Sequence, residues 1–242
     1  MKIVELDKPK IKSVKMLVDN VIDEKLTNYE MIDCCWSRTS FNILIGGMGQ
    51  GKTTLMINLL KNVFNKCFNH VYVIMPKQSR ASVKDNYLEK NIPSQYFRDE
   101  ISVEILEDIL DELKENTKEK EFSMVIIDDM GSDLKNKYIV KQLQKMILSM
   151  RHLRCSFWLL QQNFQQLNKS LRELASNFIS YDIGKSQLEK LFNESIQLPK
   201  EKFLELTNLA FDEPHRWICL NTKTKRFFKG FDEIEIDDEE KL

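Results

Sequence analysis

The chain has 242 residues, long enough for one large α/β domain or two small ones. Its hydrophobic content of 42% and charged content of 30% are ordinary for a globular protein, and its net charge of −1 excludes a general electrostatic attraction to nucleic acid. The sequence has no C-x-x-C pair, no secretory signal and no apolar run near the ~18 residues of a membrane span, so we expect free thiols in a reducing compartment, no zinc site and no membrane span.

The first part of the chain mixes lysines, acids and apolar residues without a clean period. We expect residues 1–37 to form an N-terminal helical arm, with a helix around Val14–Tyr29. No internal repeat or low-complexity linker follows, so we expect one domain over residues 38–231. The acidic residues from Asp232 onward predict a solvated tail over residues 232–242.

Residues 46–53 read GGMGQGKT and match the phosphate-binding loop pattern G-x-x-x-x-G-K-[ST]. The apolar run Phe41–Ile45 before it predicts a buried strand, and the apolar spacing over Thr54–Phe64 predicts a helix after it. In such a loop, backbone N–H groups bind phosphates, Lys52 bridges the β- and γ-phosphates, and the Thr53 hydroxyl binds Mg²⁺. The expected nucleotide-binding residues are Gly46, Gly47, Met48, Gly49, Gln50, Gly51, Lys52, Thr53 and Thr54.

Strand-like and helical patterns alternate through the rest of the chain, which predicts an α/β fold with a mostly parallel central sheet flanked by helices. The expected strands are His70–Met75, a short one at Ile101–Ile105, Met124–Ile127, Ser156–Leu160 and Phe178–Ile183. Helices are expected around residues 106–121, 143–150, 188–192 and 203–209. A hairpin is expected from Trp217–Leu220 and Arg226–Phe228.

An acidic pair follows the apolar run Met124–Ile127. Asp128 at the end of this strand can hold Mg²⁺ through its water shell, and Asp129 is then placed to orient or deprotonate the attacking water. Two acids after a strand are also common helix caps. The preceding phosphate-binding loop favours the metal site, so we expect ATP and Mg²⁺ as ligands.

The next predicted strand, Ser156–Leu160, is followed by residues with amide side chains. Gln162 can contact the γ-phosphate or the attacking water, with Gln161 as the neighbouring alternative. The same residues also fit the start of a polar loop.

Together these motifs resemble the FtsK–HerA superfamily of DNA-pumping ATPases. Within it, the segment RHLRCSFWLLQQNFQQLNKSLRELASNF (151–178) is most similar to the packaging ATPases of poxviruses, other nucleocytoplasmic large DNA viruses and virophages. The resemblance covers roughly residues 38–184. It implies a RecA-like P-loop NTPase core of the ASCE type. The implied partners are double-stranded DNA, further copies in a homo-oligomeric ring (pentamer or hexamer), and a viral capsid or portal vertex. The implied location is the host cytoplasm, in the virus factory, and the virion.

The resemblance also implies roles for single residues. Gln162 matches the sensor glutamine, and Arg151 matches an arginine that reaches the neighbour's γ-phosphate, with Arg154 as the next candidate. Arg172 and Asn177 match a later Arg–Asn segment. Cellular members usually carry Glu where this chain has Asp129, so the shorter side chain must come closer to the water.

Several basic groups are candidates for contact with DNA phosphates, although such lysines often only solvate a helix. They are Lys77, Arg80 and Lys84; Lys135, Lys137, Lys141 and Lys145; and the stretch Thr222–Lys229.

The leading hypothesis is an ATP-driven translocase that packages viral DNA. The alternatives are a nucleotide-dependent assembly switch that moves nothing and a P-loop phosphotransferase. The absence of an N-K-x-D motif argues against a GTPase, and the absence of an arginine-rich lid argues against a phosphotransferase.

Overall fold

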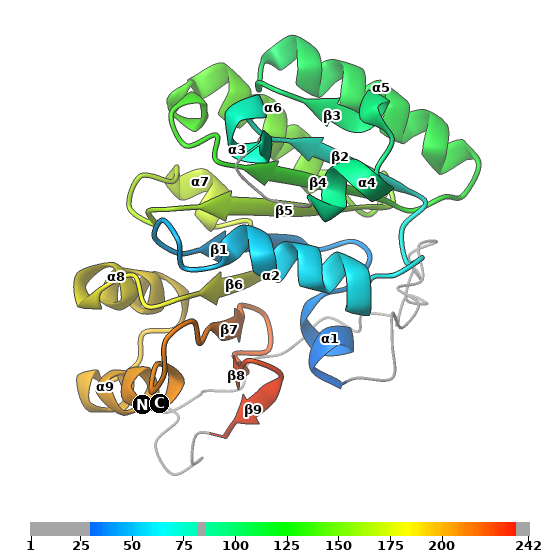
Figure 1. The fold of residues 1–242 in the computed structure, drawn as a ribbon. Helices are drawn as coiled ribbons and strands as arrows, with labels where there is room; N and C mark the ends of the chain where they lie inside the picture. The colour runs from blue at the N-terminus through cyan, green and yellow to red at the C-terminus, as the bar shows by residue number, and fades with distance from the viewer. Residues whose placement is uncertain (1–29, 82–85, 236–242) are drawn as a thin grey trace, which may run out of the picture.

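The computed structural model describes residues 30–81 and 86–235 (Figure 1). The expected helix at Val14–Tyr29, Lys84 and most of the expected acidic tail lie outside these ranges. Among the described residues, no helix has the length and apolar character needed to cross a bilayer.

A single nine-stranded sheet organises the described residues, with the strand order β3-β2-β4-β5-β1-β6-β7-β8-β9. The first six strands in this order run parallel, and β7 to β9 add antiparallel strands at one edge. The expected α/β fold with a mostly parallel sheet is therefore confirmed. The strands are β1 (Phe41–Ile45), β2 (His70–Ile74), β3 (Phe97–Arg98), β4 (Ser123–Asp128), β5 (Cys155–Gln161), β6 (Asn177–Ser180), β7 (Ile218–Asn221), β8 (Phe227–Lys229) and β9 (Asp232–Ile234).

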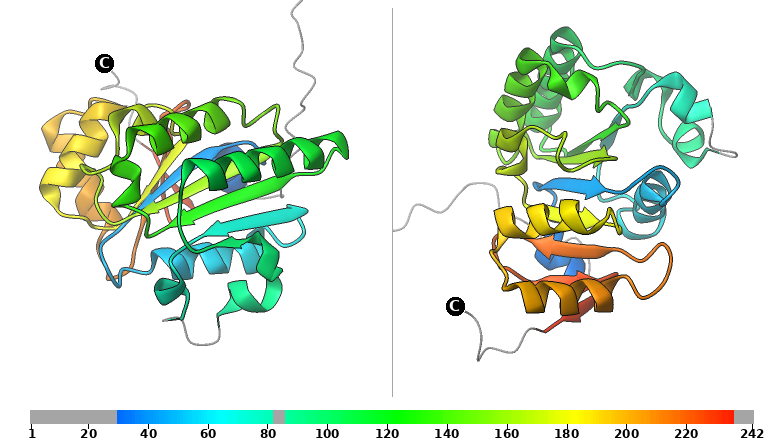
Figure 2. Two further views of the ribbon diagram at one scale, coloured as in Figure 1. Left: turned by 90° about the horizontal axis from the view of Figure 1, so that it is seen from above. Right: turned by 90° about the vertical axis from the view of Figure 1, so that its left-hand side faces the viewer.

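Helices cover both faces of the sheet, as the two views in Figure 2 show. The α-helices are α1 (Glu30–Cys35), α2 (Lys52–Asn58), α3 (Lys77–Ala81), α4 (Tyr87–Asn91), α5 (Val103–Lys118), α6 (Lys137–Leu148), α7 (Lys169–Arg172), α8 (Lys185–Ser195) and α9 (Lys200–Ala210). A π-helical turn, Leu59–Val63, extends α2, and 3₁₀ turns occur at Ser94–Tyr96 and Asp133–Lys135.

The two faces form separate apolar clusters because neighbouring side chains of a strand point to opposite faces. On β5, Phe157 and Leu159 pack with the cluster under α5 to α9, whereas Trp158 and Leu160 pack with the cluster under α1 and α2. Strands buried on both faces read as continuous apolar runs, which explains why β1, β4 and β5 were recognisable in the sequence.

One expected strand is wrong. Ile101–Ile105 instead leads into α5, because the Ser102 hydroxyl accepts a hydrogen bond from the backbone N–H of Ile105 (3.2 Å) and caps the helix at Val103. The edge strand lies earlier, at Phe97–Arg98.

Both ends of the described chain differ from the expected arm and tail. Residues Met31, Ile32 and Trp36 are buried against the sheet, so this part of the expected arm belongs to the core. The expected hairpin is confirmed as β7 and β8, and Asp232–Ile234 pairs with β8 as β9 where we expected solvated tail. The outer limits of the domain stay predictions.

Candidate functional site

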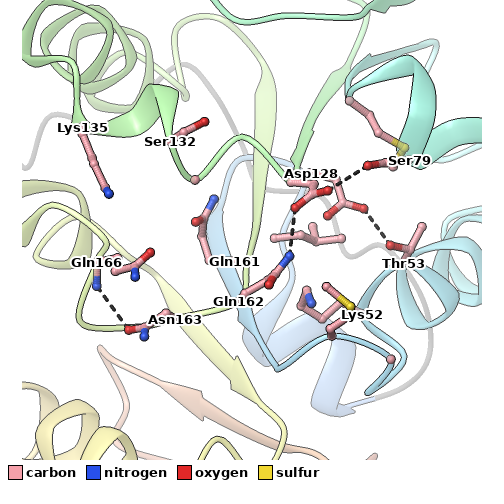
Figure 3. A pocket seen from close by; sticks show the side chains of 16 residues that line it. Lys52, Thr53, Ser79, Asp128, Ser132, Lys135, Gln161, Gln162, Asn163 and Gln166 are labelled. Carbon is pink, nitrogen blue, oxygen red and sulfur yellow. Dashed lines mark hydrogen bonds between the residues drawn. The ribbon is translucent and has the colours of Figure 1, made fainter.

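A cleft of about 500 Å³ opens at the carboxyl ends of the parallel strands β1, β4 and β5 (Figure 3). This edge is where ligands bind in open α/β sheets. The lining residues come from the glycine loop, the ends of β2, β4 and β5, and the loops that follow them. They are Met48, Gly49, Lys52, Thr53, Met75, Ser79, Asp128, Asp129, Gly131, Ser132, Lys135, Leu160, Gln161, Gln162, Asn163 and Gln166.

The glycine loop joins β1 to α2 and packs against Tyr181, the residue that follows β6. Gly51 has φ +102°, a left-handed conformation that side chains other than glycine's rarely tolerate. A Cβ on Gly46 would lie 2.8 Å from Cδ2 of Tyr181, so the loop requires glycine there as well. Burial raises the pKa of Tyr181 to about 12, and its protonated hydroxyl donates to the carbonyl oxygen of Gly51 (3.2 Å).

Lys52 points back over the loop that it follows. Its ammonium donates to the carbonyl oxygens of Gly46 (2.7 Å) and Gly47 (3.1 Å). Burial lowers the pKa of Lys52, while Asp128 and Asp129 act in the opposite direction. A phosphate group in the loop would compete for the same ammonium, so Lys52 is placed for the role that the sequence predicts.

The two expected metal ligands are in direct contact. The Thr53 hydroxyl donates to Oδ2 of Asp128 over 2.7 Å. Burial raises the pKa of Asp128, and the Thr53 hydrogen bond and Lys52 oppose this shift. A buried carboxylate beside a hydroxyl suits Mg²⁺, which binds few protein oxygens and completes its shell with water and phosphate. The described residues contain no group of three or more His, Cys, Asp or Glu side chains that could hold a metal ion.

Asp129 and Gln162 contact each other directly. The Gln162 amide donates from Nε2 to Oδ1 of Asp129 over 2.9 Å. Asp129 has φ +59°, which is uncommon for a residue with a side chain. It is exposed and lines the same cleft as Lys52 and Thr53. The structure thus brings the expected base and the expected sensor together.

A third contact of Asp129 was not predicted. Ser79, on α3 after β2, donates from Oγ to Oδ2 of Asp129 over 2.8 Å. No motif in the sequence marks this serine. The neighbouring positions of β2 and β4 bring the two residues together, and only the strand order reveals that.

Gln161 lies beside Gln162 at the end of β5 but is 5% exposed. Its carbonyl oxygen accepts from the backbone N–H of Gly46 (3.0 Å), which ties the sensor strand to the phosphate loop. Its side-chain nitrogen makes no hydrogen bond among the described residues and borders the cleft. The structure thus keeps both amides at the site, with Gln162 as the one that contacts Asp129.

Arg151 and Arg154 lie far from the cleft of their own subunit. Both precede β5, whereas the cleft borders the far end of this seven-residue strand, roughly 20 Å away at ~3.3 Å per residue. Arg154 donates to the carbonyl oxygen of Lys120 (3.1 Å) and stacks on the Phe122 ring. Neither arginine can therefore reach a nucleotide bound to the same subunit.

The expected catalytic role of Arg172 is wrong for its own subunit. This side chain is 8% exposed, pairs with Glu194 (3.1 Å) and lies over the Phe164 ring, 4.6 Å from its centroid. It does not line the cleft. Asn177 is likewise structural, because its buried amide bonds to the side chains of Asn42 (2.8 Å) and Asn221 (3.0 Å) across three strands.

The basic groups differ in what they contact. Arg80 pairs with Asp99 and Glu89, while Lys229 pairs with Asp212 and Arg226 with Glu233, so these cations are occupied within the chain. Two lysines of α6, Lys141 and Lys145, are exposed. Lys135 lines the cleft itself.

A protein-family model described as "Poxvirus A32 protein" matches residues 36–220, about three quarters of the chain. The matched region contains the whole cleft. A search among curated protein sequences found no significant match.

The fold is similar to several solved structures of low sequence identity. B204, the DNA-packaging ATPase from Sulfolobus turreted icosahedral virus, is 16% identical with a TM-score of 0.60, over 82% of this chain and 98% of that chain. The genome packaging NTPase B204 of Sulfolobus turreted icosahedral virus 2, in complex with ATP-gammaS, is 16% identical with a TM-score of 0.55, over 79% and 96%. EssC (ATPases 2 and 3) from Geobacillus thermodenitrificans is 14% identical with a TM-score of 0.53, over 84% and 41%.

Proposed function

Because the chain belongs to the Poxvirus A32 protein family, we propose that it is a Mg²⁺-dependent ATPase that drives double-stranded DNA into a viral capsid. The observation that carries the ATPase assignment is the meeting of five expected residues in one cleft. Lys52, Thr53, Asp128, Asp129 and Gln162 all line it, and they come from three separate segments of the chain. The packaging assignment is supported by the family and by the similar folds of the B204 proteins.

Each residue of the cleft has a distinct task in phosphoryl transfer to water. The loop N–H groups and Lys52 bind the phosphates and offset the charge that develops on them. Thr53 and Asp128 would hold Mg²⁺, which neutralises phosphate charge when bound. Asp129 accepts a proton from the attacking water, and Gln162 sets the direction of the Asp129 carboxylate.

We predict different effects for the two acids of β4. Asp128→Asn weakens Mg²⁺-dependent ATP binding and turnover, because an amide is a poor magnesium ligand. Asp129→Asn spares binding and slows turnover by roughly 10²-fold or more, because the amide cannot accept the proton. The measurement is ATP affinity, by fluorescence of a labelled nucleotide, alongside turnover. Equal loss of affinity in both variants would contradict this division of labour.

A fast ATPase needs an arginine at the transferring phosphoryl group, and the cleft of a single subunit does not supply one from the residues that the structure describes. Among the described residues, no arginine lines the cleft. An arginine from a neighbouring copy would complete it, which supports a homo-oligomeric ring of five or six subunits, with Arg151 as the contributing residue. Such a ring would surround the DNA duplex and dock on the capsid or portal vertex, in the host cytoplasm or virus factory and in the virion.

For contact with DNA, we propose the exposed face of α6. Lys141 and Lys145 lie one helical turn apart on this face, with Tyr138 63% exposed beside them. A duplex that is moved regardless of its sequence must be held by its phosphates, so binding should depend steeply on salt.

The corresponding test uses the double variant Lys141→Glu, Lys145→Glu. We expect it to lose DNA-stimulated hydrolysis, to keep the DNA-free rate, and to reduce the slope of log affinity against log salt by about 2. Lys61→Glu, Lys66→Glu is the matched control, since it makes the same charge change near α2 on the opposite face of the sheet. If the control loses stimulation equally, α6 is not the contact.

A further inference from the structure

The cleft has two halves that are lined by different side chains. In Figure 3, Lys52, Thr53 and Asp128 lie on one side, where the proposed triphosphate and Mg²⁺ bind. Gln161 and Lys135 lie on the other side, which the proposed reaction does not use. We call this second side the amide half, and its lining side chains are those of Ser132, Lys135, Gln161, Asn163 and Gln166.

The alternation of side chains along β5 explains why two neighbouring glutamines belong to different halves. Gln161 follows Leu159 to the face of the sheet that α5 to α9 cover, whereas Leu160 points to the opposite face. A Cβ on Gly131 would lie 3.2 Å from Oε1 of Gln161, so this amide lies against the loop between β4 and α6. Gln162, the next residue, instead donates to Asp129 (2.9 Å).

The amide half offers hydrogen-bond donors. Gln161 is 5% exposed, and its amide nitrogen is buried without a hydrogen-bond partner among the described residues. A buried donor without an acceptor costs free energy, which a bound acceptor would recover. The amide oxygen of Asn163 accepts from the backbone N–H groups of Gln165 (2.8 Å) and Gln166 (3.3 Å), so its nitrogen is the end left to donate elsewhere.

The charges around the amide half favour an anion. Lys135 is exposed and adds an ammonium group to the lining. The carboxylate of Asp133 accepts from the Ser132 hydroxyl (3.1 Å) but does not line the cleft. The carboxylate of Asp129 is held on the other side by Gln162. An oxyanion with several acceptor oxygens matches an ammonium beside amide donors.

We propose that the amide half holds the inorganic phosphate that hydrolysis releases, between the ammonium of Lys135 and the amide of Gln161. The inference rests on the proposed function, because cleavage beside Gln162 would form the phosphate at the border of the two halves. A small turn of the Gln161 side chain presents its nitrogen to the cleft. Phosphate held there is separated from ADP, so ATP does not re-form. The backbone phosphate of a rigid duplex does not reach a buried amide at the end of β5, which favours free phosphate as the ligand.

Equilibrium dialysis of the full chain with radiolabelled inorganic phosphate tests this subsite without hydrolysis. In the Lys52→Ala background, where the phosphate loop lacks its lysine, phosphate binding should remain. Adding Lys135→Ala or Gln161→Leu should weaken it roughly tenfold, the order expected for losing a hydrogen bond to a charged group, and Lys135→Arg should preserve it. Lys137→Ala is the matched control, because Lys137 is exposed two residues further on and does not line the cleft.

Two further measurements identify the source of the phosphate. Added phosphate should inhibit ATP turnover of wild type without competing with ATP, and Lys135→Ala should need roughly tenfold more phosphate for the same inhibition. The affinity of the nucleotide-free chain for duplex DNA should stay the same in Lys135→Ala. Loss of DNA affinity without loss of phosphate binding would assign Lys135 to the DNA backbone and overturn the inference.

The inference is also overturned if Lys52→Ala alone removes phosphate binding, or if Lys135→Ala and Gln161→Leu both leave it unchanged. Lys135 is exposed, so an effect at this position does not come from loss of the fold. A chain that binds inorganic phosphate as expected but hydrolyses no ATP under any condition would instead overturn the proposed function.

Discussion

Replacing Lys52 by alanine is expected to abolish ATP hydrolysis and to weaken triphosphate binding strongly. The side chain is the only lysine at the phosphate loop, and its ammonium is already held over the loop by the carbonyl oxygens of Gly46 and Gly47. Without it, the phosphate loop loses the cation that is placed to meet the β- and γ-phosphates and the charge that develops between them. The measurement is the rate of ATP turnover and the affinity for ATP, determined on the same preparation of Lys52→Ala and compared with wild type.

Lys61→Ala is the matched control for this experiment. Lys61 is exposed on the π-helical turn that continues α2, away from the cleft, so its loss should leave turnover unchanged. Both variants should melt near the wild-type temperature, because neither lysine forms part of the apolar clusters. Turnover near the wild-type rate in Lys52→Ala would remove the basis for the site.

The second large effect is expected at Arg151. If this arginine completes the neighbour's site, Arg151→Ala should slow hydrolysis by ~10³-fold or more, because a trans arginine meets charge that develops on the transferring phosphoryl group. Nucleotide affinity should change much less. Arg154, the next candidate, stacks on the Phe122 ring and donates to the carbonyl oxygen of Lys120 within its own subunit.

Mixing inactive subunits tests action in trans. An Arg151→Ala subunit has an intact phosphate loop, and a Lys52→Ala subunit has an intact arginine, so interfaces between them should recover part of the activity. The control is each variant alone at the same total concentration. No recovery in mixtures shown to co-assemble would assign Arg151 a structural role and make Arg154 the next residue to test.

The parts of the site that could be predicted from the sequence are those whose structure depends on short stretches of neighbouring residues. The glycine loop needs positive φ angles at Gly49 and Gly51, which its own residues allow whatever the rest of the chain does. Asp128 and Gln162 follow apolar runs long enough to be buried strands, and the carboxyl ends of parallel strands meet at one edge. Their meeting with Lys52 and Thr53 therefore followed from the order of the elements.

The parts that the sequence missed depend on contacts between distant segments. Ser79 reaches Asp129 only because β2 pairs with β4. Arg172 was expected at the catalytic site, but Glu194 and Phe164 from other segments hold it. The strand expected at Ile101–Ile105 was wrong for a local reason: the Ser102 cap and the helical spacing after it outweigh three β-branched residues.

The central claim is that ATP hydrolysis at this cleft moves DNA, and third-strand displacement tests it most directly. Assembled protein is added to a DNA duplex that carries a fluorescent triplex-forming strand, and release of that strand is followed with ATP or a non-hydrolysable analogue. We predict release with ATP by wild type, and none with the analogue or with Lys52→Ala. Hydrolysis by an assembled, DNA-bound wild-type ring without any strand release would contradict the translocase and favour an assembly switch.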